Sequence, residues 1–389
     1  MNWKKPFSLI VFCLMASNAM AELNFNGFLS VGAGALTDDD EITSYEGFDG
    51  DWSTDPDTVF ALQVSAPISD KVTATGQLIA RGEDDYNLEA EWAYLSYSVS
   101  DNFDVRVGRL RAPFFVYSDF LDVGYAYPFI SPPSQSYRFV FSTVEGVDAI
   151  YQSQLGSWDS TVQAYYGRLT DETVLGGESV DLDLVGFTGI NWALTKDWFT
   201  VRMTYNQAET SIGLPTALSN SAGTGFLDIL NGAGFTSVAD ALNPDEEDAS
   251  FYGIGFNIDY NDWLVISEYT VLDIDKQAAF SDDESIYILV GKRFGDFTYH
   301  VTWDHNENDP DYDFLNVIPA GVDPGLDALR AGAISTIPET EATDVTLGVR
   351  WDFAPGTAFK FEVTNLDRES AIAADRDGTL VRFAFDMVF

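Results

Sequence analysis

Six charged side chains between residues 81 and 122 have types and spacing suited to an electrostatic role. They are Arg81, Arg106, Arg109, Arg111, Asp119 and Asp122. Guanidinium groups that face carboxylates across a narrow polar aperture orient dipolar solutes and favour some ions over others. The alternative for each arginine is a structural ion pair that leaves passing solutes unaffected. Which interpretation holds depends on the elements that carry these residues.

Residues that catalyse covalent reactions are scarce in this chain. Its only histidines are His300 and His305, and neither stands in a serine–histidine or metal-ligand spacing. The run 304–313 partly matches a calcium-binding loop, but Asp309 occupies the position that requires glycine. We therefore expect no enzymatic activity, no catalytic residue and no cofactor. For the acidic runs we favour a solvated surface, and the alternative is a divalent cation held between carboxylates and lipopolysaccharide phosphates.

The first 21 residues have the features of a secretory signal peptide. A lysine pair precedes a short apolar run, and a small-x-small motif ends at Ala21. The apolar run is too short to cross a bilayer. The only cysteine, Cys13, lies in this leader, so the mature chain, residues 22–389, has neither a disulfide framework nor a thiolate metal site. We expect residues 22–389 to form one exported domain.

Composition narrows the class of the exported domain. The chain carries 62 acidic and 20 basic residues, a formal net charge of −42, and so does not bind nucleic acid by neutralising phosphates. Aromatic residues make up 14% of the sequence, which argues against disorder. No mature segment approaches 18 consecutive apolar residues, and this excludes helical membrane spans.

The mature chain repeatedly alternates apolar and polar residues with a period of two. One example is the segment 345–353, where the apolar residues are Val345, Leu347, Val349, Trp351 and Phe353. This period predicts β-strands with one apolar and one polar face. The apolar face packs on a core in a soluble sandwich, whereas in an outer-membrane barrel it meets lipid and the polar face lines the lumen.

The connections between strands separate these two architectures. We predict sixteen strands, near 23–35, 58–68, 72–81, 88–99, 103–110, 141–154, 158–167, 184–194, 198–208, 249–260, 263–273, 284–294, 297–305, 344–353, 358–367 and 379–389. Every second connection is a tight turn, and the others are longer and acidic: 36–57, 82–87, 111–138, 168–183, 209–248, 274–283, 306–343 and 368–378. Regular short–long alternation is typical of outer-membrane barrels, with periplasmic turns and extracellular loops.

The last strand and several strand starts carry further membrane-barrel features. The alternating apolar row at the end of the chain consists of Phe383, Phe385, Met387 and Phe389. A terminal phenylalanine on such a row resembles the assembly signal that the barrel-assembly machinery of bacterial outer membranes recognises. Tryptophans follow the tight turns at Trp158, Trp198 and Trp263, where an interfacial aromatic girdle is expected.

Taken together, the mature chain resembles the trimeric, sixteen-stranded porins of Gram-negative outer membranes. In that family the third loop folds into the barrel, and a wall arginine faces acids on that loop. The segment 111–138 is rich in aromatic residues and proline, which favours a loop buried inside the barrel. The alternative is a surface loop that packs on neighbouring loops or on a neighbouring subunit. The resemblance assigns the wall arginine to Arg109, which follows Gly108, and the loop acids to Asp119 and Asp122.

Strand alternation places the other arginines. Arg106 is inward by alternation with its neighbours, Arg81 is inward on the third strand, and Arg111 begins the loop. Strict alternation points Arg109 outward, so its assignment to the pore requires a bulge at Gly108.

The resulting prediction is an all-β transmembrane antiparallel barrel of about 16 strands in the cell outer membrane, with an inward-folded third loop. We expect passive, cation-biased diffusion of small polar solutes and ions. The expected partners are outer-membrane lipid, lipopolysaccharide and the barrel-assembly machinery, and the resemblance implies a homotrimer. The alternative function is an adhesin or receptor that uses the large loops at 209–248 and 306–343.

Overall fold

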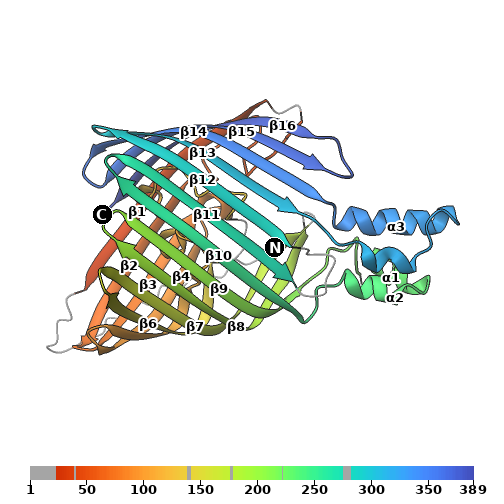
Figure 1. Ribbon diagram of the computed structural model, residues 1–389, viewed down its shortest axis with the longest axis horizontal. Coiled ribbons are helices and arrows are strands. Elements are labelled where there is room, and N and C mark those ends of the chain that lie inside the picture. The colour runs from red at the N-terminus through yellow and green to blue at the C-terminus, as the bar shows by residue number, and fades with distance from the viewer. Residues whose placement is uncertain (1–22, 39–40, 138–141, 176–177, 221, 275–281) are drawn as a thin grey trace, which may run out of the picture.

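Sixteen antiparallel strands form a closed barrel in which β1 pairs with β16 (Figure 1). The computed structural model describes residues 23–38, 41–137, 142–175, 178–220, 222–274 and 282–389, so the expected signal peptide lies outside the described residues. The strands are β1 Asn24–Asp38, β2 Val59–Ser69, β3 Val72–Arg81, β4 Leu88–Ser100, β5 Phe103–Arg111, β6 Thr143–Leu155, β7 Trp158–Leu175, β8 Glu178–Lys196, β9 Phe199–Ile212, β10 Glu247–Tyr260, β11 Trp263–Ile274, β12 Asp283–Phe294, β13 Phe297–Asn308, β14 Thr340–Ala354, β15 Thr357–Ser370 and β16 Arg376–Val388. The predicted sixteen-stranded antiparallel barrel is confirmed.

The two ends of the barrel differ. One end carries the long connections and the helices and is called the loop end, while the tight turns lie at the opposite turn end (Figure 1). The helices are α1 Phe226–Gly232, α2 Thr236–Ala241 and α3 Pro324–Thr336, with short 3-10 turns η1 Gly82–Asp84, η2 Ser118–Phe120, η3 Gly124–Ala126 and η5 Asp313–Val317. In the described part of the chain, none of the helices combines the length and apolar character needed to cross a membrane.

The boundaries of β7 and β8 differ most from the prediction. The stretch 168–183 was expected to be a loop, but β7 continues to Leu175 and β8 begins at Glu178. Leu169 pairs with Leu184, and both are buried on the inner face. The acidic residues between them favoured a loop in the sequence prediction. However, the part of a strand above the bilayer meets water on its outer face, where acidic side chains are tolerated.

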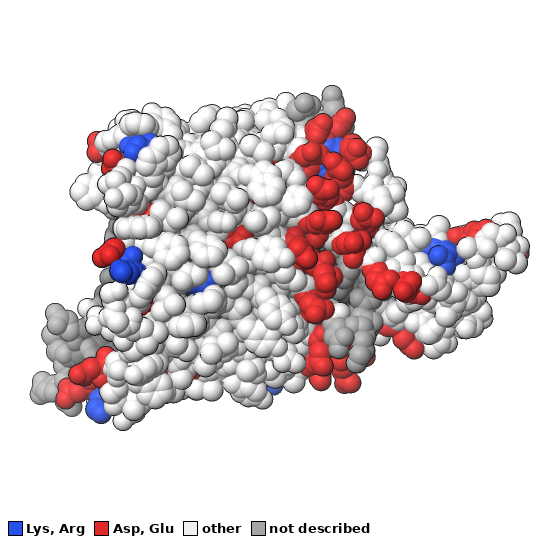
Figure 2. Space-filling view, viewed as in Figure 1, with Lys and Arg blue, Asp and Glu red and all other residues white. Residues whose placement is uncertain are grey.

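The outer face of the barrel is apolar. Trp198, Trp263 and Phe297 are exposed next to tight turns, and a lysine lies over the Trp263 ring with its Nζ 5.0 Å from the centroid. On the face shown in Figure 2, a mostly uncharged band covers the middle of the barrel, and acidic residues gather toward the loop end. An exposed apolar band between two polar rims is what a lipid-embedded barrel requires.

Strand β16 closes the barrel against β1. Phe385 pairs with Val31 and Met387 pairs with Leu29, so the predicted apolar row lies on the outer face. Phe389 extends the pairing, because its backbone N–H and carbonyl exchange hydrogen bonds of 3.0 and 2.9 Å with Gly27. Within this part of the chain the terminal strand has a partner on both sides, which removes an exposed sheet edge.

Two long loops pack together outside the barrel. The connection that carries α1 and α2 and the connection that carries η5 and α3 share an apolar cluster that includes Leu230, Val238, Leu315 and Ala333. Their helices project beyond the loop end (Figure 1). The cluster gives the two loops a common core.

Candidate functional site

The segment between β5 and β6 is here called the third loop, and its described residues 112–137 pack against inward-facing residues of the barrel wall. One apolar anchor is Phe114, whose ring centroid lies 5.4 Å from that of Phe187 and 5.3 Å from that of Phe251. A second anchor is formed by Tyr117, Tyr127 and Phe129, which pack on inward residues of β11 and β12. The aromatic residues of this segment therefore cover apolar patches of the lumen wall.

Basic side chains of the wall hold the carbonyl groups of the third loop. Lys360, on β15, is fully buried, and its Nζ donates hydrogen bonds to the carbonyls of Gly124 and Phe129 at 2.6 and 2.5 Å. Arg350, on β14, donates to the carbonyls of Tyr125 and Tyr127 at 2.7 and 2.8 Å. A loop without regular secondary structure needs such partners, because a buried carbonyl without a hydrogen bond is unfavourable.

Acidic side chains of the wall hold the loop's backbone N–H groups in the same way. Glu268, on β11, accepts a hydrogen bond from the N–H of Val116 at 3.0 Å. Glu362, on β15, accepts one from Ile130 at 2.9 Å. Hydrogen bonds to charged groups are stronger than neutral ones, so these contacts fix the course of the loop.

A compact ion cluster ties the middle of the third loop to the opposite wall. The Arg81 guanidinium lies 2.9 Å from both Glu91 and Asp122. Arg111 pairs with Glu91 at 3.0 Å and donates a hydrogen bond to Asp122. Burial alone would raise the pKa of the Asp122 carboxyl, but the guanidinium groups of Arg111 and Arg81 outweigh burial and lower it.

Two further ion pairs line the lumen. Asp119 is half exposed and lies 3.0 Å from Arg202, a residue of β9 that also donates to the carbonyl of Val116. Arg106 is inward, as predicted, and its Nε donates to Asp148 of β6 at 2.9 Å. Except for Arg109, the predicted acids and arginines thus touch oppositely charged partners directly.

Arg109 lies apart from this group, on the outer face. It pairs in register with Glu145 and lines an outer groove with Val107 and Tyr166, which are both exposed. The bulge needed at Gly108 is not formed, because the register of β5 runs through Gly108 without a shift. Gly108 has φ +140°, and a Cβ there would lie 2.2 Å from the Ala93 carbonyl oxygen, which explains the glycine.

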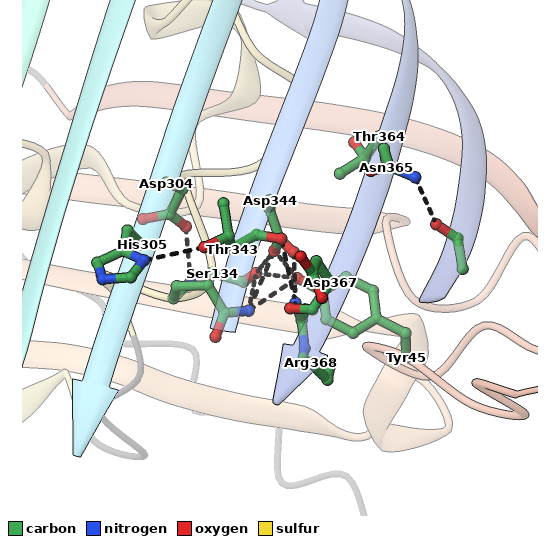
Figure 3. A network of polar contacts seen from close by, with 12 residues as sticks. Tyr45, Ser134, Asp304, His305, Thr343, Asp344, Thr364, Asn365, Asp367 and Arg368 are labelled. Carbon is green, nitrogen blue, oxygen red and sulfur yellow. Dashed lines mark hydrogen bonds and ion pairs between the residues drawn. The ribbon is translucent and has the colours of Figure 1, made fainter. Parts of the chain in front are cut away.

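The connection between β1 and β2, which carries Tyr45 and is here called the first loop, joins the third loop at the loop end. The Tyr45 hydroxyl donates to Asp344 of β14 at 2.6 Å, and Arg368 of β15 lies 2.7 Å from the same carboxylate (Figure 3). Gln135 of the third loop donates to Asp344 at 3.0 Å. Its neighbour Ser136 donates to Asp304 of β13 at 2.7 Å. One network therefore joins both loops to three strands.

The sequence interpretation missed the basic residues that contact the loop from distant strands. They are Arg202, Arg350, Lys360 and Arg382. Each lies on the polar face of an alternating strand, so its inward direction was visible in the sequence. The contact with the third loop was not visible, because it depends on where a loop far away in sequence crosses the lumen.

Comparisons with known proteins identify the fold. No protein-family model and no curated protein matches the sequence. The outer-membrane channel DcaP of Acinetobacter baumannii has a TM-score of 0.58 at 12% identity, covering 94% of this chain and 97% of that chain. A loop-deletion form of OmpT, an outer membrane protein of Vibrio cholerae, gives 0.56 at 13%, with 94% and 99% covered. An anion-selective porin from Comamonas acidovorans gives 0.55 at 11%, with 94% and 99% covered.

Proposed function

We propose that this chain, which has the fold of the outer-membrane porins, forms a water-filled channel for passive diffusion of small polar solutes and ions. The observation that carries the proposal is the third loop, which charged wall residues hold inside a closed barrel with an apolar outer face. Such a loop would narrow the lumen of the barrel. The chain would reside in the outer membrane of a Gram-negative bacterium, inserted by the barrel-assembly machinery among lipid and lipopolysaccharide.

We place the selective charges mainly at the loop end. Near the third loop, the described arginines lie in contact with carboxylates. The electric fields of these opposite charges therefore largely cancel in the lumen. At the loop end, four exposed glutamates lie side by side on the outer face of adjacent strands β12 to β15: Glu284, Glu307, Glu341 and Glu369. With the net charge of −42, this row gives the loop end a negative potential that attracts cations and supports a cation bias.

The first test is single-channel conductance of the folded barrel in a planar bilayer under a salt gradient. We expect stable current steps and a reversal potential of the sign for cations, with a preference that weakens as salt rises, because ions screen the acidic entrance. Steps in groups of three would match a homotrimer, the assembly that one similar structure, OmpT of Vibrio cholerae in its trimer form, records. Folded protein without conductance would refute the channel.

A matched pair of arginine variants tests the inner charges. We expect Arg202→Gln to increase cation selectivity, since it leaves the half-exposed Asp119 carboxylate without its cation in the lumen. Arg109→Gln removes the same charge from the outer face and should leave the reversal potential unchanged. Equal shifts in both variants would contradict the placement of these residues.

An adhesin or receptor remains the second candidate, favoured by the projecting helices with their shared apolar core. Replacing the two loops with short turns separates the functions. An adhesin would lose surface binding and keep its conductance, whereas a channel would show little change in either.

A further inference from the structure

An apolar cavity of about 140 Å³ lies in the lumen wall on the loop side of the third loop. Its lining is formed by inward residues of β8 to β11 together with Phe114 of the third loop. Most of the lining residues are apolar, among them Phe114, Leu182, Leu184, Phe187, Ala208 and Phe251. An aliphatic and aromatic lining is unexpected on the lumen side of a barrel, where polar residues normally meet water.

One polar group in this cavity has no hydrogen-bond partner among the described residues. Thr210 is 5% exposed, lines the cavity, and its hydroxyl makes no hydrogen bond within that part of the chain. The neighbouring Asn206 is satisfied, because its side chain bonds to Tyr165 and Thr204. Buried hydroxyls are normally hydrogen-bonded, so the Thr210 hydroxyl is available to a ligand that brings a polar group.

The size and charge of the cavity limit its ligand. An apolar cavity of about 150 Å³ accommodates benzene, so this one fits a single aromatic ring or a short alkyl chain. None of the described residues that line it is charged, and the chain as a whole is strongly acidic, which disfavours anions.

The cavity also borders the anchor of the third loop. The carbonyl of Pro113 accepts hydrogen bonds from Asn191 at 3.1 Å and from Thr204 at 3.3 Å. From Thr204, strand β9 continues through Ala208 and Thr210 toward the loop end. A solute that enters from the loop end therefore reaches the cavity before the constriction.

We propose that this cavity is a binding site for the apolar part of a neutral or cationic amphipathic solute, whose polar group bonds to the Thr210 hydroxyl. The proposal rests on the proposed channel and deepens it, because it names a class of solute that the channel would take up preferentially. The ring would pack between Phe114, Leu184 and Phe251, while the polar group remains near β9.

Benzyl alcohol is a suitable probe, and glycerol is its control without an apolar part. We expect benzyl alcohol, added on the loop side, to interrupt the single-channel current of the wild type, and glycerol to cause no interruptions. Ala208→Phe places a ring in the cavity and should reduce the interruptions at least ten-fold. Ala164→Phe makes the same change on the exposed outer face and should have no effect, so it controls for probe dissolved in the bilayer. Thr210→Val should shorten each interruption roughly five-fold, because the bound probe loses one hydrogen bond.

A second measurement separates this site from the channel itself. Ligand-observed magnetic resonance detects benzyl alcohol on the folded barrel without any current. Loss of that signal in Ala208→Phe, with retention in Ala164→Phe, supports the site even if no conductance is found, and in that case only the channel fails. If conductance is normal and benzyl alcohol acts equally on Ala208→Phe and Ala164→Phe, the proposed binding site is refuted. Electrophoretic mobility of unheated samples confirms that each variant is folded.

Discussion

Lys360→Met should lower the free energy of unfolding by about 3–5 kcal/mol, the usual effect of removing one partner of a buried ion pair. The Lys360 side chain is fully buried, and its Nζ lies 2.9 Å from Asp386, which is also fully buried. Methionine removes the cation and the two hydrogen bonds to the third loop, and Asp386 keeps a buried charge without a partner. We also expect noisier single-channel currents, because the loop loses its anchor at Gly124 and Phe129.

The double variant Lys360→Met/Asp386→Leu provides the control. Replacing a buried ion pair with apolar groups of similar volume is often close to neutral, so the double variant should recover much of the stability lost by Lys360→Met. The current noise should remain, since the carbonyl anchors are still missing. Denaturant unfolding from detergent and bilayer recordings measure the two effects. A double variant less stable than Lys360→Met would show that the ion pair is not the cause.

The barrel itself was predictable because its determinants are local. Period-two alternation fixes which residues face lipid, and the alternation of tight turns with long connections fixes the closed antiparallel order. Strand ends were less predictable, as 168–183 shows, because acidic residues suit both a loop and a strand above the bilayer. The packing of α1 and α2 against α3 was not predicted, because it joins loops about 90 residues apart.

The site was predictable only in part. Alternation placed Arg81 and Arg106 inward, and the loop acid Asp122 meets Arg81. The family resemblance placed Arg109 in the pore against its own alternation, and the structure places it on the outer face. The local pattern was the better guide for Arg109, whereas the contacts of Lys360 required the path of the third loop.

The same contacts explain why the lumen wall carries so many buried charges. A third loop without regular structure exposes donors and acceptors in an irregular order, and the wall must match them one by one. Basic side chains meet its carbonyls and acidic side chains meet its N–H groups. Apolar wall residues could not satisfy these groups, so the charged wall is a consequence of an irregular buried loop.

Asp122→Asn should weaken the opposite anchor of the third loop and destabilise the protein by about 1.5–3 kcal/mol, the range for hydrogen bonds to charged groups. Arg81 and Arg111 keep Glu91 as a partner, so the expected loss is smaller than for Lys360→Met. We expect larger current fluctuations at neutral pH, because the loop moves away from the β3 wall.

Acid should reproduce the effect of this substitution in the wild type. The folded state lowers the pKa of Asp122, so the ionised carboxylate stabilises the folded protein. This stabilisation is fully present above the ordinary pKa of 3.8 and is lost as the pH falls from 3.8 through the lowered pKa of the folded state. Wild-type current noise should therefore rise below about pH 4, while Asp122→Asn should already be noisy at pH 7 and change less on acidification. Arg109→Gln serves as the control and should follow the wild type. If Asp122→Asn shows the full acid response, other carboxylates cause it, and Asp122 is not the anchor that titrates.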